Sequence, residues 1–514
     1  MEIAAASAVL CVSLVSVLAM LAYRFVDRLW LKPKRLENRL MRQGLSGSSY
    51  RLLYGDSRDE NKACREANSK PINLSDDIVP RLLPFINLRI QKFGGNCITW
   101  SGPTPRLILL EQDLVKDVFT RISEFHNPNE DPIIKMLVSG LASYNDDKWA
   151  KHRTLLNPAF HLQKLKNMVP AIHICASEMI GKWKALVSGD GSCELDVWPD
   201  VQDLARDIIS RTAFGSSFEE GRRIFELQKE LISVLFQAAA LMYIPGYRFL
   251  PTKLNRRIKV IDKEIRATLH AIIVRKKKAM NADTASEDDL LGILIESNQR
   301  EMKEHKNGMT IEDVIEECKL FYFAGQETTA ALLVWTMILL SQHKEWQARA
   351  REEVQQVFGD KSPTMDGVNH LKILNMILHE VLRLYPPIPF LTRTTYKEAK
   401  LGPFTLPAGV EVCIPILMQH HDPKIWGADA REFNPERFAE GVSKASKGHG
   451  AFYPFGWGPR ICIGQNFSLL EAKVAMAVIL QQFSFKLSPS YTHAPCSIIT
   501  AQPQHGAHLV LRKN

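Results

Sequence analysis

One cysteine of this 514-residue sequence lies in a setting that could make its sulfur reactive. Cys462 belongs to the segment FGWGPRICIG at 455–464, a constrained loop of glycines and one proline, and the apolar residues 469–479 that follow have the pattern of a helix. Backbone N–H groups and the N-terminal end of that helix would stabilise the sulfur as a thiolate. Arg460, two residues earlier, could meet a carboxylate of a bound cofactor. The alternative for an isolated Gly-x-x-x-Cys is a buried structural cysteine in a turn.

The remaining cysteines indicate neither a disulfide framework nor a metal cluster. Nine cysteines occur, an odd number, at wide spacing and without a C-x-x-C pair. Zinc and iron–sulfur sites use closely spaced cysteines, and disulfide-rich domains use paired ones. The cysteine usage therefore favours a reducing compartment, in which most of these residues are small apolar core side chains.

A second group with chemical potential lies inside a long apolar segment, residues 310–341, for which we predict a buried helix. Thr310 is a plausible capping residue, and the letters AGQETT at 324–329 interrupt the apolar pattern. Gly325 costs about 1 kcal/mol relative to alanine, and a buried carboxylate such as Glu327 costs several times more unless it is hydrogen-bonded. Two unfavourable residues so close together in one buried helix suggest that Glu327, with the adjacent Thr328, has a functional role. The alternative is a packing glycine beside a surface-facing acid.

The elements that must position these groups are mainly helical. A helix predicted at 371–384 places Glu380 and Arg383 on one face, although such a pair is most often exposed and contributes little. Polar breaks in the helical region have the composition of surface loops rather than domain boundaries. Strands are few and cluster near the two ends of the chain. We predict a hairpin from 97–100 and 107–110, a turn at 406–409 between 403–405 and 410–414, and C-terminal strands at 483–487 and 508–511.

The N-terminal segment has the properties of a membrane anchor. Residues 3–23 are apolar or small and uncharged, which is enough to cross a hydrocarbon core of roughly 30 Å as a helix. Seven basic residues follow within 24–42, which places the rest of the chain in the cytosol. A cleaved signal peptide is the weaker alternative, because no positive charge precedes the apolar run. We therefore predict an anchor at 1–23, a basic, proline-containing linker at 24–45 and one catalytic domain at 46–514.

The overall charge is mildly basic. Lysine and arginine number 65 against 56 acidic residues, a formal net charge of +9, which fits a membrane surface or an acidic partner. The sequence lacks zinc-finger spacing and basic motifs with interleaved aromatic residues, so we expect no nucleic-acid partner. It also lacks a flavin or dinucleotide fingerprint.

Five ordered motifs make the sequence resemble the cytochrome P-450 superfamily of haem-thiolate monooxygenases, over essentially the whole chain. The segment 455–464 matches the signature F-x-x-G-x-R-x-C-x-G, and 324–329 matches the oxygen-activation motif A-G-x-[DE]-T-[TS]. Residues 149–153 match W-x-x-x-R, 380–383 match E-x-x-R and 435–438 match P-E-R-F. The resemblance implies a mainly α fold with small β-sheets (the cytochrome P-450 fold), plus one N-terminal transmembrane helix.

The resemblance also implies a role for each matched residue. Haem b would be bound with Cys462 as the iron ligand, a thiolate that favours O–O cleavage. Glu327 and Thr328 would relay protons to oxygen. The other implied residues are Trp149, Arg153, Arg393, Phe455, Gly458, Arg460 and Gly464 for binding the cofactor, Glu380, Arg383 and Arg437 for structural support, and Phe321, Ala324, Leu391 and Ile499 for contacting substrate.

A narrower likeness, carried by segments such as FSLLEAK at 467–473 and QPQHGA at 502–507, is to the plant secologanin-synthase-like (72A-type) group. It implies a hydrophobic, terpenoid-like substrate, O2, and electrons from NADPH through NADPH-cytochrome P-450 reductase at the endoplasmic reticulum membrane, with a single span. Two alternatives stay open: a haem-thiolate isomerase or dehydratase, which needs no reductase, and a non-catalytic haem-binding protein of the membrane.

Overall fold

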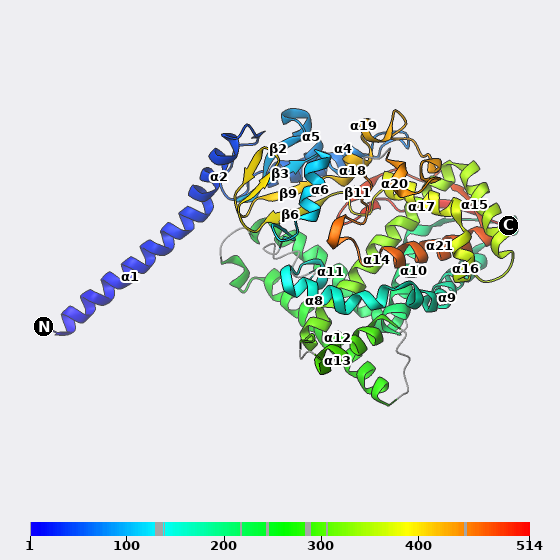
Figure 1. Cartoon of the computed structure of the whole chain (residues 1–514), viewed down its shortest axis with the longest axis horizontal. Helices are drawn as coiled ribbons and strands as arrows, with labels where there is room; N and C mark the ends of the chain where they lie inside the picture. The colour runs from blue at the N-terminus through cyan, green and yellow to red at the C-terminus, as the bar shows by residue number, and fades with distance from the viewer. Residues whose placement is uncertain are drawn as a thin grey trace.

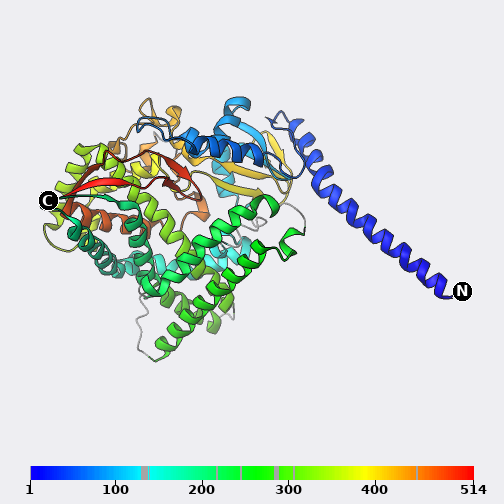
Figure 2. The ribbon, with the colours of Figure 1, turned by 180° about the vertical axis from the view of Figure 1, so that it is seen from behind.

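A computed structural model describes residues 2–128, 137, 139–215, 218–242, 246–282, 289–304, 307–446 and 450–514. One straight helix at the N-terminus projects away from a body that combines a sheet with many helices (Figure 1). The sheet lies at the end of the body that receives this helix, and the C-terminus lies at the opposite end (Figures 1 and 2).

The projecting helix is α1 (Glu2–Val26), and it continues through a π-helical turn, Asp27–Leu31, into α2 (Lys32–Met41). The predicted linker is therefore largely helical, because Pro33 falls in the first turn of α2, where a proline is tolerated. Residues Leu10–Met41 form a candidate membrane span, and its most apolar stretch is not buried against the protein. The aromatic rings of Trp30, Tyr50 and Trp100 pack in series and join the end of this helix to the sheet.

The larger sheet has six strands and joins distant parts of the chain. The predicted hairpin is confirmed as β2 (Asn96–Ser101) and β3 (Thr104–Leu109), with a tighter turn than expected. The predicted turn at 406–409 is also confirmed, with Gly409 at a φ of +84°. Its flanking strands belong to different sheets, because β8 (Phe404–Leu406) pairs with β7 (Ala399–Leu401) whereas the strand after the turn pairs with β3. The large sheet is completed by β1 (Ser46–Gly47), β9 (Glu411–Ile414), β6 (Leu391–Thr395) and β4 (Phe125–His126), in the order β1-β2-β3-β9-β6-β4.

The two predicted C-terminal strands are confirmed and pair with each other. They are β10 (Phe483–Leu487) and β13 (His508–Lys513), which run antiparallel, and β5 (Ser192–Asp196) adds to the far side of β13. A two-stranded ribbon, β11 (Pro495–Ser497) and β12 (Ala501–Pro503), lies between them in the chain.

The long predicted helix is α14 (Ile311–Gln342), which begins at a capping box formed by Thr310 and Asp313. It is apolar and long enough to cross a membrane, but most of it is buried inside the body, so it is the central core helix. Helix α10 (Val197–Phe214) packs along it. Gly325 lies at this contact: a Cβ there would be 2.7 Å from the Cδ1 atom of Ile209, so the glycine allows the two helices to approach closely.

The remaining helices complete the body, and the fold class predicted from the sequence is confirmed. They are α3 (Ser57–Asn68), α4 (Val79–Leu82), α5 (Pro84–Phe93), α6 (Gln112–Thr120), α8 (Asp146–Leu156), α9 (Leu162–Leu186), α11 (Phe218–Met242), α12 (Lys253–Asn281), α13 (Leu290–Glu304), α15 (Lys344–Phe358), α16 (Met365–His370), α17 (Lys372–Leu384), α18 (Ile416–His420), α19 (Pro423–Trp426), α20 (Val442–Ala445) and α21 (Gln465–Gln482). Short 3₁₀ turns occur at η2 (Gly140–Ala142), η3 (Asn157–Phe160), η4 (Tyr247–Phe249), η5 (Pro435–Phe438) and η6 (Gly458–Arg460).

Candidate functional site

The cysteine loop is a closed turn that ends where α21 begins. The backbone N–H of Cys462 donates a 2.9 Å hydrogen bond to the carbonyl oxygen of Phe455, which closes the loop. Gly458 has a φ of +73°, and a Cβ there would lie 2.8 Å from the carbonyl oxygen of Phe119. Only glycine fits that position without displacing backbone. The loop conformation is therefore determined by hydrogen bonding and by close backbone approach.

Cys462 differs from the other cysteines in its surroundings. All nine lie in described parts of the chain, and only Cys462 and Cys11 of the N-terminal helix are exposed. Desolvation nevertheless raises the pKa of the Cys462 thiol, because protein atoms surround it, while the N–H of Gly464 and the charge of Arg153 act to lower it. Cys462 thus has accessible surface although its thiol is largely desolvated, as expected of a residue that a bound group covers.

Two arginines attach the neighbouring elements to the cysteine loop. Arg153 of α8 donates a 2.8 Å hydrogen bond from Nη1 to the carbonyl oxygen of Ile461, the residue before Cys462. Arg460 donates from Nη1 to the carbonyl oxygen of Tyr144, at 2.9 Å, and its guanidinium lies 4.6 Å from the ring centroid of Trp149. The predicted cofactor residues Trp149, Arg153 and Arg460 therefore lie together beside the loop.

Arg393 adds a further positive charge near Arg460. It lies on β6 and is buried, and burial together with the charge of Arg460 lowers its pKa to about 10. Burial likewise lowers the pKa of Arg460 to about 10. Within the described chain neither guanidinium forms an ion pair, and Nε of Arg460 has no hydrogen-bond partner. Guanidinium groups that are largely desolvated and lack an ion-pair partner favour an anionic ligand, and the two carboxylates of haem fit this donor set.

Glu327 lies half-buried in the middle of α14. Burial raises the pKa of its carboxyl group, an effect that Arg206, Gln326, Thr500 and Lys229 oppose. Its Oε1 accepts a 3.2 Å hydrogen bond from Nε2 of Gln326, and Oγ1 of Thr500 is 3.5 Å from its Oε2. Glu327 is therefore a carboxyl group that holds its proton to a higher pH than usual and has a hydroxyl group within reach.

The two threonines that follow Glu327 have different partners. Thr328 donates a 2.7 Å hydrogen bond from Oγ1 to the carbonyl oxygen of Ala324, one turn earlier on α14. Thr329 is buried, and its Oγ1 lies 3.2 Å from Oγ of Ser468 on α21. Thr328 thus stays on the face of α14 that carries Ala324, whereas Thr329 bridges to the helix that follows the cysteine loop.

The pair that sequence reasoning treated as commonly exposed is fully buried. Both side chains are 0% exposed, and Arg383 donates to both carboxylate oxygens of Glu380 at 2.7 Å. Arg383 also donates to the carbonyl oxygens of residues 420, 430 and 432. Nε of Arg437 lies 3.6 Å from Oε1 of Glu380. These three residues, predicted as structural support, form one network that joins α17 to the segment before the cysteine loop.

The residues predicted to contact substrate are apolar and come from three elements. Phe321 and Ala324 lie one turn apart on α14, and Leu391 begins β6, close to the cysteine loop at Gly456. Ile499 is partly buried next to Thr500, which contacts Glu327. The loop between Phe125 and Tyr144, for which the family resemblance also implies substrate contact, lies partly outside the described residues.

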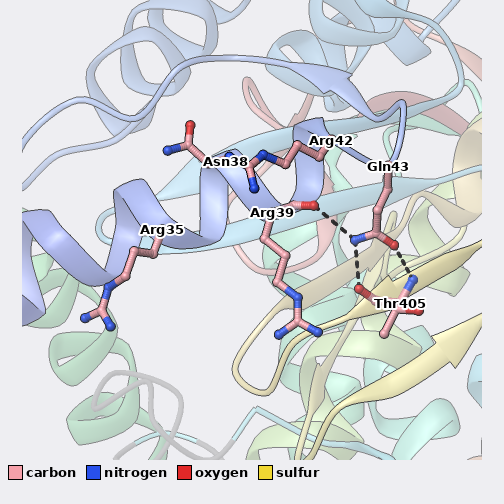
Figure 3. A pocket seen from close by; sticks show the side chains of 6 residues that line it. All are labelled: Arg35, Asn38, Arg39, Arg42, Gln43 and Thr405. Atoms are coloured by element: carbon pink, nitrogen blue, oxygen red, sulfur yellow. Dashed lines mark hydrogen bonds between the residues drawn. The ribbon is translucent and has the colours of Figure 1, made fainter.

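Several residues that complete the site were not predicted from the sequence. Asn145, at the start of α8, accepts a 2.9 Å hydrogen bond from Nη2 of Arg460, and its position before two aspartates was the available signal. His152 and Glu317 form a buried pair behind this region, for which one sequence offers no signal. A surface hollow between α2 and β8 was also unexpected (Figure 3). It contains no residue of the cysteine site and is lined by Arg35, Asn38, Arg39, Arg42, Gln43 and Thr405.

Comparison with known proteins agrees with this geometry. The family model for cytochrome P-450 matches residues 84–505. The chain is 56% identical to cytochrome P-450 72A219 of Panax ginseng, over 96% of each chain. It is 54% identical to cytochrome P-450 72A397 of Kalopanax septemlobus, over 96% of this chain and 95% of the relative, and 54% identical to cytochrome P-450 72A15 of Arabidopsis thaliana over the whole of both. The chain therefore belongs to the cytochrome P-450 family, within its 72A type, and is a haem-thiolate monooxygenase.

Proposed function

We propose that this monooxygenase oxidises a hydrophobic, terpenoid-like small molecule, with electrons that NADPH supplies through a separate reductase. The observation that carries the proposal is the half-buried carboxyl group of Glu327 on the same helix as Phe321 and Ala324. A proton-holding group beside an apolar surface suits the oxidation of an apolar molecule. The terpenoid class is supported by the likeness to secologanin-synthase-like proteins.

Each group of residues in the site would have its own role. Haem b, when bound, supplies the activation of O2, with Cys462 as its iron ligand. Glu327 would hold a proton and Thr328 would pass it into the substrate site, because proton delivery favours formation of oxidised product over loss of peroxide. The cofactor would be bound by Trp149, Arg153, Arg393, Phe455, Gly458, Arg460 and Gly464, and the buried network of Glu380, Arg383 and Arg437 would support the loop that holds it.

The membrane and the reductase belong to the same proposal. The exposed apolar helix α1 would span the endoplasmic reticulum membrane once and leave the catalytic domain in the cytosol, with 24–45 as the connecting segment. The basic excess of the chain suits an acidic reductase surface. In cell membranes, the full chain is expected to resist alkaline carbonate extraction, and release by carbonate would contradict the single-span anchor.

Reconstitution with NADPH-cytochrome P-450 reductase tests the proposal. The full-length protein, the reductase and NADPH would be incubated under O2 with a panel of mono- and triterpenoids, and products would be identified by mass spectrometry. The proposal predicts a product heavier by one oxygen atom, labelled from 18O2, that requires both NADPH and reductase. Conversion of an added hydroperoxide without reductase would indicate the isomerase or dehydratase, and haem binding without turnover would indicate a non-catalytic protein.

A further inference from the structure

A buried cluster of hydrogen-bonded side chains lies behind the cofactor arginines, between α8 and α14. Glu317 and His152 are each 0% exposed, and Nδ1 of His152 lies 2.6 Å from Oε1 of Glu317. The second carboxylate oxygen of Glu317 accepts a 3.0 Å hydrogen bond from the backbone N–H of Leu141. Nε2 of His152 faces Oδ1 of Asp313 at 3.8 Å. A carboxylate this deep is costly unless its partners are fixed, so the cluster constrains three elements at once.

On its loop side, the cluster is connected to Arg460 through the backbone after Leu141. Leu141 lies in the turn η2, next to Gly140, which has a φ of +81°. A Cβ at Gly140 would lie only 2.8 Å from Oε2 of Glu317, too close for any residue other than glycine unless that carboxylate moves. The chain after this turn contains Tyr144 and Asn145, which accept the hydrogen bonds of Arg460 at 2.9 Å each. Glu317 therefore fixes the turn from which the acceptors of Arg460 extend.

On its helix side, the cluster is connected to Arg153 through His152 of α8. His152 precedes Arg153 on α8, and Arg153 donates to the carbonyl oxygen of Ile461 beside Cys462. On α14, Glu317 lies one turn before Phe321 and two turns before Ala324, so it continues the face that carries the substrate-side residues. Glu317 of α14 is thus linked indirectly to Arg153 beside the cysteine loop and to Arg460 within it.

We propose that Glu317, through His152 and the backbone of Leu141, is a positioning residue that holds Arg153 and Arg460 in the geometry that binds the haem carboxylates. Glu317 contacts neither arginine and acts only through the loop and α8. Replacement of a residue that orients binding groups in this indirect way typically lowers the affinity for the bound group by about 10–100-fold. The inference rests on membership of the family and not on any particular substrate.

Haem transfer from the purified full-length holoenzyme to excess apomyoglobin tests this role without turnover. Glu317→Ala is expected to release haem about 10-fold faster than the native protein. Glu317→Gln keeps an oxygen for the N–H of Leu141 and is expected to stay close to the native rate. The matched control is Asp196→Ala, which removes a carboxylate that accepts backbone N–H bonds from Trp198 and Ala507 in the C-terminal sheet. This control is expected to lower thermal stability without changing haem release.

Hydrogen exchange by mass spectrometry supplies the second readout. Glu317→Ala is expected to increase amide exchange in residues 140–145, whereas Asp196→Ala is not. If Glu317→Ala yields no holoenzyme, Gly140→Ala disturbs the contact from the loop side, and it is expected to show the same faster haem release and faster exchange. Native rates of haem release in Glu317→Ala, or in Gly140→Ala, would overturn the proposal, as would faster release with unchanged exchange at 140–145.

Discussion

Buried Arg393 and partly buried Arg460 carry positive charges that act on each other, and neither forms an ion pair in the described chain. One comes from β6 and the other from the cysteine loop, so the fold itself brings the charges together. Such an arrangement is unfavourable unless an anion joins it. It is the clearest sign in the structure that a dianionic cofactor completes this site.

Replacement of Arg393 should therefore have opposite effects with and without haem. Arg393→Gln removes one of two repelling charges, and we expect the haem-free protein to become more stable by about 1 kcal/mol. The holoenzyme should lose haem faster, because one guanidinium donor is gone. Urea denaturation of both forms and haem transfer to apomyoglobin provide the measurements, and a loss of stability in both forms would contradict the explanation.

The buried network around Glu380 should be among the most sensitive parts of the fold. Glu380→Gln leaves Arg383 buried without its charged partner, which typically costs about 3–5 kcal/mol. We expect a large fall in the urea midpoint and little haem incorporation. The matched control is Glu440→Gln, which breaks the exposed pair with Lys444 and should change stability by less than about 0.5 kcal/mol. Equal effects of the two substitutions would be inconsistent with the burial of the network.

Glu327 should make the free energy of unfolding depend on pH, in a direction that follows from its raised pKa. Burial raises its pKa in the folded protein, so the folded state binds more protons than the unfolded state between the unfolded and folded pKa values. The contribution of this group to stability therefore falls as the pH rises through that window. Glu327→Gln stays uncharged, so its melting temperature relative to the native protein should increase with pH. Parallel melting curves at all pH values would contradict the raised pKa.

The same substitution should alter the yield of oxidised product. Glu327→Gln cannot release and regain a proton, so more of the NADPH consumed should appear as hydrogen peroxide and less as product. The ratio of product to NADPH in the reductase-coupled assay measures this effect. An unchanged ratio would exclude Glu327 from proton delivery.

The contact between Gly325 and Ile209 can be tested by a double-mutant cycle. Gly325→Ala should cost about 1–2 kcal/mol, because the new methyl group meets Cδ1 of Ile209 at 2.7 Å. In the Ile209→Ala background the same change should be neutral or stabilising, since alanine favours a helix. Equal costs in the two backgrounds would show that the glycine is needed for another reason.

Much of the site could be predicted from the sequence because its parts lie on single elements. The capping pattern and apolar run of α14, and the glycine-rich loop that ends at α21, depend on local chemistry alone. The pairing of β8 and β9 with different sheets depends on distant strands, and no local pattern reports it. For the same reason, the sequence did not reveal that Gly325 packs on Ile209 or that Glu317 meets His152, which precedes it by 165 residues.

The most direct test of the account is the carbon monoxide difference spectrum of the dithionite-reduced protein. If Cys462 is the iron ligand as a thiolate, the main absorption band of the carbon monoxide complex will be shifted far to the red, and Cys462→Ala will lose that band while the fold is retained. A freshly prepared, folded protein whose band stays at the shorter wavelength of a nitrogen-bound or thiol-bound haem would contradict the assignment of Cys462.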